Sequence, residues 1–86
     1  MKELEKQLKA LANVRRLKIL KYLERVNRAS VSDIAKEINL SFKSTSRHLA
    51  ILRTAEIVIN NQEALVVFYR LITPQSKIVK ESLTMC

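Results

Sequence analysis

Residues 30–52, SVSDIAKEINLSFKSTSRHLAIL, encode two short helices separated by a tight turn. Ser30 followed three residues later by Asp33 is a capping-box pattern, so the first helix is predicted to begin there. It is predicted to end near Asn39, because asparagine tolerates the left-handed backbone that often closes a helix. Helices this close in sequence pack against each other, and their junction constrains the rest of the fold.

The second helix of this pair is predicted over residues 42–55, with Ser41 as its N-cap. Its inward face has helical spacing and consists of Thr45, Leu49 and Leu52. The other face carries small residues and two cations, namely Lys43, Ser44, Ser46, Arg47 and Ala50. Serine can contact either base pair in the major groove, and lysine or arginine contacts guanine or phosphate. The pattern therefore indicates a helix that reads double-stranded DNA.

Three further helices are predicted from apolar residues at helical spacing, over residues 2–12, 14–25 and 74–84. Asn13 is expected to cap the second of these helices. Thr73 is expected to cap the last one, with Pro74 at the first helical position, where a missing N–H costs nothing.

Two segments rich in β-branched and aromatic residues follow the DNA-reading helix. Strands are predicted over residues 57–60 and 64–72, with residues 61–63 as the turn of a hairpin. The order is then four helices, a hairpin and a helix. This order is mainly α with a small β-hairpin, and we expect it to form one domain over residues 1–86.

Composition supports a small basic domain. A chain of 86 residues buries only about 60–65% of its unfolded surface, which favours self-association. Sixteen Lys and Arg against eight Asp and Glu give a net charge of +8, which suits a polyanionic partner, although a solvated basic helix face explains much of this charge equally well.

Cys86 is the one cysteine, so no internal disulfide forms. With neither a signal peptide nor an apolar span, we expect a cytoplasmic protein without membrane association.

Three segments, LKALANVRRLKIL, LSFKSTSRHLAILRTAEIV and FYRL, resemble the arsenic-repressor (ArsR/SmtB) family of winged helix-turn-helix regulators. The similarity runs from Leu8 to Leu71. It implies a homodimer held by the first and last helices, with the helix over residues 42–55 in the major groove. It also implies a wing beside the DNA backbone and repression of transcription. Two such helices related by a two-fold axis address half-sites about 34–36 Å apart.

The resemblance also implies which residues contact DNA and which form the dimer interface. The DNA-contacting set is Lys43, Ser44, Thr45, Ser46, Arg47, His48 and Arg53. The dimerisation set is Leu4, Leu8, Leu11, Ile78, Val79 and Leu83.

This chain departs from the family in its sensor and wing segments. The segments SVSDIAKEI and PQSKIVKESLTMC lack the cysteine and histidine ligands of metal-sensing relatives, so no metal or other cofactor is expected. Residues 59–65 at the wing carry no cation. Phosphate neutralisation is therefore assigned to Lys43, Arg47, Arg53 and whichever of Arg15, Arg16 and Lys18 face the duplex.

The chain contains no glycine. The family favours glycine after its third and fourth helices, where this sequence has Asn39 and Glu56. Asparagine is a reasonable substitute, whereas Glu56 at positive φ would cost roughly 1 kcal/mol. The alternative is that the turn after the fourth helix takes another geometry.

Two functional interpretations remain open at this point. The first is a dimeric, sequence-specific DNA-binding regulator. The candidates for its signal are a small ligand at the dimer interface, a partner protein, oxidation of Cys86 and a change in protein concentration. The second is a winged-helix module that binds another protein through its uncharged, apolar wing. An enzyme has no support, because the sequence offers no glycine-rich phosphate loop, nucleophile–base pair or carboxylate pair, and no catalytic residue is assigned.

Overall fold

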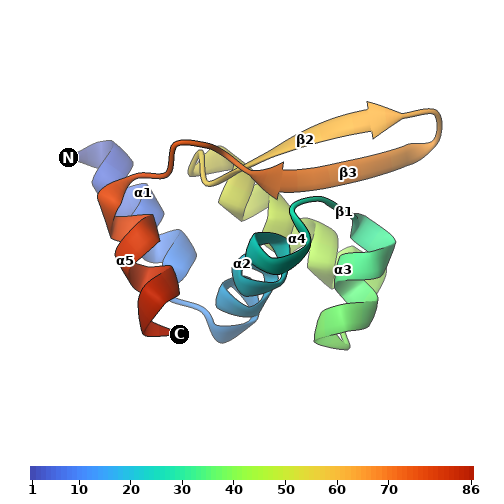
Figure 1. The fold of residues 1–86 in the computed structure, drawn as a ribbon, viewed down its shortest axis with the longest axis horizontal. Coiled ribbons are helices and arrows are strands. Elements are labelled where there is room, and N and C mark those ends of the chain that lie inside the picture. Colours follow the sequence, from blue (N-terminus) through green and yellow to red (C-terminus); the bar gives the residue numbers. More distant parts are fainter.

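The computed structural model describes residues 1–86 and contains five α-helices and a three-stranded sheet (Figure 1). In chain order the elements are α1 (Lys2–Leu11), α2 (Val14–Val26), β1 (Ala29–Ser30), α3 (Val31–Ile38), α4 (Phe42–Thr54), β2 (Val58–Glu63), β3 (Val66–Leu71) and α5 (Lys77–Met85). The predicted winged helix-turn-helix is confirmed, with the short strand β1 in addition. No helix has the length and apolar character that crossing a membrane requires.

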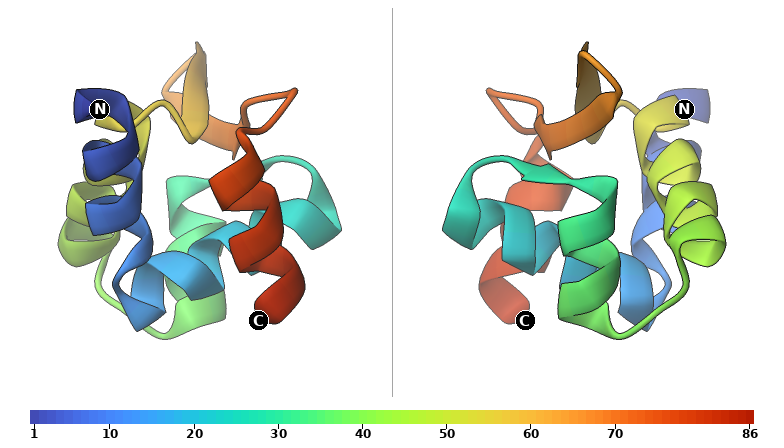
Figure 2. Two further views of the ribbon diagram at one scale, coloured as in Figure 1. Left: turned by 90° about the vertical axis from the view of Figure 1, so that its left-hand side faces the viewer. Right: turned by 90° about the vertical axis from the view of Figure 1, so that its right-hand side faces the viewer.

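The elements are arranged along a body of 36 × 23 × 21 Å. Helices α1 and α5 lie side by side at one end, and the tip of the β2–β3 hairpin lies at the other end (Figure 1). The hairpin lies on one side of the helices (Figure 2), and most residues of β2 and β3 are exposed or half-buried. Helices α2, α3 and α4 pack together between these two ends.

One hydrophobic core joins the helices and the base of the sheet. Its most deeply buried side chains come from five elements and the turn before β2, and are Ile19, Leu20, Leu23, Ile34, Leu49, Leu52, Ile57, Val58 and Val79. Burial of one such side chain contributes about 1.5–3 kcal/mol. Since α5 supplies Val79, the C-terminal helix belongs to the same cooperative unit as the helix-turn-helix.

Polar side chains begin four of the five helices by accepting a hydrogen bond from a backbone N–H three residues on. The caps are Asn13 (3.1 Å), Ser30 (3.1 Å), Ser41 (3.1 Å) and Ser76 (3.4 Å). The first three confirm the caps expected from the sequence, because capping depends on residues close together in the chain.

The predicted start of the last helix is wrong. Helix α5 begins at Lys77, three residues after Pro74, and its cap is Ser76 instead of Thr73. The side-chain amide of Gln75 donates to the backbone carbonyls of Ile57 (3.3 Å) and Ile72, which ties the segment before α5 to the base of the hairpin. This contact joins residues distant in sequence and overrides the local signal.

The sheet has the order β1–β3–β2 and is antiparallel throughout. Ala29 pairs with Tyr69, and both are buried against the helices. Ser30 and Asn61 pair with Phe68 from either side, one residue along, so these three side chains face outward. The sheet therefore has a core face and an outer face.

The hairpin turn lies three residues later than predicted. Strand β2 continues through residues 61–63, and the turn is formed by Ala64 and Leu65, with Ala64 at φ 56°. Two-residue turns favour such positive φ angles because they match the strand twist. The sequence does not predict this turn, because glycine or asparagine normally occupies the position that Ala64 has here.

Four residues without the freedom of glycine adopt positive φ, namely Asn27 (73°), Asn39 (55°), Glu56 (59°) and Ala64 (56°). Asn39 closes α3 as expected, and Glu56, for which two geometries were open, adopts the left-handed one after α4. After each helix the two following N–H groups bond back to its last turn, the Schellman pattern, at 3.3 and 3.0 Å after α3 and at 2.9 and 3.0 Å after α4.

Candidate nucleic-acid interface

The junction between α3 and α4 exposes the beginning of α4. Asn39 reverses the chain at the end of α3, and Ser41 caps α4 two residues later. The first turn of α4 contains no acidic residue. The positive end of its helix dipole is therefore available to an anion.

We call α4 the reading helix. Its outward face is basic. Lys43 and Arg47 are exposed and lie one turn apart, and Arg53 is exposed in the last turn. None of the three takes part in the four ion pairs of the structure. Ser44 and Ser46 lie beside the two N-terminal cations and are half-buried. Cations free of internal partners can contact phosphate or base edges without first breaking a contact.

Thr45 does not belong to this face. Its side chain is fully buried, and its hydroxyl donates to the carbonyl of Ser41 at 2.8 Å. This corrects its inclusion among the DNA-contacting residues, since a side chain without exposed surface cannot reach a duplex. Thr45 instead packs with Leu49 and Leu52 along the inward face of the helix.

His48 lies on the flank of the reading helix, half-buried against α2. Its Nδ1 is 3.2 Å from a guanidinium nitrogen of Arg16. The same guanidinium donates to the carbonyls of Ala10 (2.6 Å) and Lys9 (3.2 Å) at the end of α1. Arg16 thus joins the C-terminal end of α1 to the reading helix, and it is not free to bind phosphate.

Electrostatics keep His48 neutral. Burial, followed by the charges of Arg16 and Arg15, lowers the pKa of its imidazole from the ordinary 6.5. A neutral ring that accepts from Arg16 at Nδ1 carries its proton on Nε2. His48 can therefore offer one N–H donor, but no positive charge, to a duplex at neutral pH.

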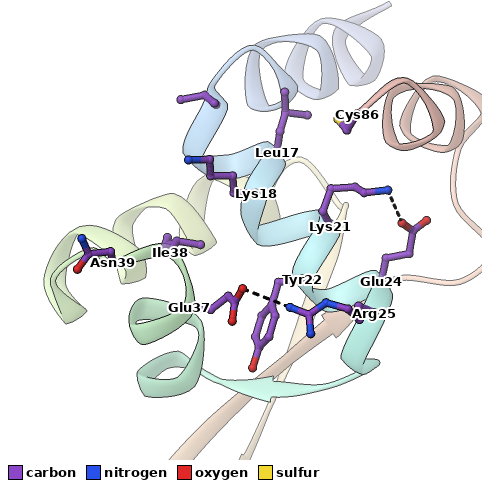
Figure 3. Close-up of a pocket in the computed structure, with 11 residues that line it drawn as sticks. Leu17, Lys18, Lys21, Tyr22, Glu24, Arg25, Glu37, Ile38, Asn39 and Cys86 are labelled. Carbon is purple, nitrogen blue, oxygen red and sulfur yellow. Dashed lines mark hydrogen bonds and ion pairs between the residues drawn. The ribbon is translucent and has the colours of Figure 1, made fainter.

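The three candidate cations of α2 have different surroundings. Arg15 is exposed, and its charge acts on His48, so it lies near the reading helix. Arg16 is held internally, as described above. Lys18 lines a separate groove between α2 and the end of α3 (Figure 3). Arg15 is thus the α2 cation best placed to supplement the reading helix.

That groove has a volume of about 810 Å³ and is bounded by α2, the end of α3 and Cys86 (Figure 3). Its walls contain the ion pairs Lys21–Glu24 (3.1 Å) and Arg25–Glu37 (3.2 Å). Nowhere in the structure do three His, Cys, Asp or Glu side chains gather as a metal site would require.

The hairpin tip is apolar and carries no cation of its own. Leu65 at the turn is 95% exposed. The charged side chains of β2 and β3 are Glu63 and Arg70, and Arg70 lies at the base, opposite Ile59. A cation from outside the hairpin, Arg28, bonds to Glu63. Sequence reasoning missed Arg28, because its contact with Glu63 depends on the pairing of β1 with β3 and on the reach of its side chain across Phe68.

The proposed dimerisation residues fall into two groups. Leu4 and Leu8 are 43% and 47% exposed on α1, and half-buried Ile78 lies across a groove of about 590 Å³ between α1 and α5. The other three, Leu11, Val79 and Leu83, are buried within the protomer. Only the first group is free to contact a second copy.

Comparison with known proteins agrees with this geometry. A family model described as "Bacterial regulatory protein, arsR family" matches residues 13–60. The transcriptional activator HlyU of Vibrio cholerae serotype O1 is 42% identical over 76 residues, which are 88% of this chain and 69% of that protein.

Several solved structures have a similar fold over most of this chain. HlyU from Vibrio cholerae superposes with a TM-score of 0.80 at 38% identity, over 96% of this chain and 86% of that one. NolR from Sinorhizobium fredii has a TM-score of 0.82 at 28% identity, over 98% and 80%. A homodimeric winged helix-turn-helix DNA-binding domain from Mycobacterium bovis has a TM-score of 0.82 at 26% identity, over 98% and 74%.

Proposed function

Because this chain belongs to the arsR family of bacterial regulatory proteins, we propose that it is a dimeric transcriptional regulator that binds double-stranded DNA through the reading helix. One observation carries this proposal. Lys43 and Arg47 project from the second helix of a helix-turn-helix, exposed and without ion-pair partners. The whole of residues 1–86 then serves as one cytoplasmic DNA-binding domain.

The contacts divide by chemistry. Lys43 and Arg47, with Ser44 and Ser46 beside them, face the base edges of the major groove, where such side chains discriminate between base pairs. Arg15 and Arg53 lie at the margins of this face and contact phosphates. His48 adds one hydrogen-bond donor. The hairpin lies beside the DNA backbone as a wing.

The uncovered apolar strip on α1 and α5 supports a homodimer. Leu4, Leu8 and Ile78 gain a cover when a second copy packs its α1 and α5 against them, as the Mycobacterium bovis domain is itself a homodimer. A two-fold axis at this seam places the two reading helices in successive major grooves, about 34–36 Å apart. The site is then a pseudo-palindrome.

We assign regulation to occupancy of that site, so that a dimer bound over a promoter blocks transcription. The relative HlyU is a transcriptional activator. The sign of regulation depends on where the site lies relative to the promoter, and the same protein–DNA contacts serve both outcomes.

The deciding experiment is selection of bound sequences from random duplex DNA, together with the mass of the free protein in solution. An inverted repeat bound by a dimer is expected, with affinity that falls as salt rises. Lys43→Ala/Arg47→Ala should abolish enrichment. The matched control, Lys2→Ala/Lys80→Ala, removes two exposed cations from α1 and α5 and should leave it intact. Equal behaviour of the two double variants would refute the assignment to the reading helix.

A further inference from the structure

The outer face of the wing is crossed by one long cation. Ala29 is buried, so its neighbour Arg28 points to the opposite, outer face of the sheet. Its guanidinium carbon lies 4.0 Å from the centroid of the Phe68 ring on β3, which is the geometry of a cation–π contact. Beyond that ring it reaches Glu63 at the end of β2. Arg28 thus spans all three strands.

The contact between Arg28 and Glu63 is bidentate. Nη1 donates to Oε2 at 2.7 Å, and Nη2 donates to Oε1 at 3.1 Å. The side-chain amide of Asn61 donates to the same carboxylate at 3.3 Å. This geometry lowers the pKa of the Glu63 carboxyl, chiefly through the hydrogen bonds from Arg28, so the pair stays charged at neutral pH.

A phosphodiester group presents the same pair of oxygens as a carboxylate. Arginine binds both anions through the same fork of two parallel N–H donors. The pair is also accessible, since the side chains of Arg28 and Glu63 are 44% and 50% exposed. An exposed ion pair in water is held by only a small free energy, so another anion can take the place of Glu63.

The wing has no other cation near its tip. Residues 58–71 contain one acid and one cation, Glu63 and Arg70, so the hairpin is neutral by itself. Arg70 lies nearer the base of the hairpin and lines the same hollow as Arg28, but it forms no ion pair with Glu63. We propose that Arg28 is the phosphate-binding residue of the wing, and that in the free protein the Glu63 carboxylate holds its guanidinium where a DNA phosphate binds.

This inference rests on the proposed DNA-binding function and deepens it. Glu63 competes with the duplex for Arg28, so this carboxylate lowers the affinity of the protein for DNA. Arg28 exchanges Glu63 for a DNA phosphate when the wing lies against the backbone, as it does once the reading helix is seated in the groove. Arg28 then adds affinity to the seated complex and little to random encounters.

The test measures DNA affinity against salt concentration for Glu63→Gln and for Arg28→Ala/Glu63→Gln. Comparing two variants that both lack the acid removes the repulsion between Glu63 and DNA from the result. Glu63→Gln should bind more tightly than wild type. Its plot of log affinity against log salt should be steeper than that of the double variant by about 1.8 for a dimer, since each phosphate contact adds about 0.9. Between 50 and 200 mM salt, the affinity ratio should then fall by about 12-fold.

A matched control is available in the pair Arg25–Glu37, between α2 and α3 (Figure 3). Arg25 also lies over an aromatic ring, 5.2 Å from the centroid of Tyr22. Glu37→Gln raises the net charge by the same amount as Glu63→Gln and should leave DNA affinity unchanged. An equal gain from Glu37→Gln would mean that total charge, not Arg28, is responsible, and would overturn the proposal.

Two other outcomes also decide the matter. If Glu63→Gln and the double variant have the same affinity and the same salt slope, Arg28 does not touch phosphate, while the proposed function stands. If the wild-type protein binds no duplex, both proposals fail. Should Arg28→Ala prevent folding, judged by thermal unfolding, Arg28→Lys/Glu63→Gln replaces it: the charge remains but the fork is lost, so the salt slope should persist with weaker binding.

Discussion

Replacing Glu56 by glycine is expected to stabilise the protein. Glu56 has φ 59° at the end of the reading helix, where only glycine is free of steric cost. The left-handed region costs an ordinary L-residue about 1–2 kcal/mol. Glycine gives back about 0.5–1 kcal/mol through its greater entropy in the unfolded chain. The net gain in the free energy of unfolding should be about 0.5–1 kcal/mol.

Nothing else in the structure opposes this gain. Glu56 is exposed and belongs to none of the ion pairs. The two hydrogen bonds that close the helix, from Glu56 N–H to Arg53 O at 2.9 Å and from Ile57 N–H to Leu52 O at 3.0 Å, use backbone atoms that glycine also has. In a domain of this size, the gain corresponds to a rise of about 2–8 °C in Tm.

The assay is urea unfolding followed by circular dichroism, at one fixed protein concentration because dimer unfolding depends on it. Glu56→Ala is the control, since it removes the carboxylate and keeps the Cβ atom that causes the strain. Asn39→Gly should change stability less than Glu56→Gly, because asparagine already tolerates φ 55°. The reasoning is refuted if Glu56→Gly is no more stable than Glu56→Ala.

Three further predictions concern the imidazole, the dimer seam and the wing. His48 has a pKa below its ordinary 6.5 in the folded protein, so its contribution to stability is present above pH 6.5 and is lost as pH falls through the folded value; His48→Gln should flatten that part of a pH–stability profile, and an unchanged profile would contradict the contact with Arg16. Leu8→Glu should reduce the mass in solution to the 9.9 kDa of one protomer, and a persistent dimer would place the seam elsewhere. Leu65→Glu should leave the dimer intact and weaken DNA binding several-fold by repelling phosphate, whereas loss of a protein complex with unchanged DNA affinity would favour a protein-binding wing.

Local signals in the sequence predicted the helix-turn-helix well. Ser30 and Ser41 cap helices, and Asn39 ends one, because each of these effects involves residues within one turn of each other. At Glu56 the sequence left two geometries open, and the left-handed one is adopted despite its steric cost because the chain has to reverse at that point.

Distant contacts explain most of what the sequence did not show. The turn at Ala64 and the start of α5 after Gln75 depend on pairings across the sheet and at its base. Arg16 looked like a candidate for phosphate binding, but it reaches back to Ala10 and across to His48. The direction of a long side chain on a helix surface depends on its tertiary neighbours, which periodicity alone does not reveal.

The bridge made by Arg16 has a consequence for the operator. One guanidinium bonds two carbonyls of α1 and the imidazole of His48 in the reading helix. In a dimer assembled through α1, this contact fixes each reading helix relative to the dimer interface. The distance between the two reading helices is therefore fixed as well. Such a protein should accept base changes within a half-site more readily than the insertion or deletion of a single base pair between the half-sites.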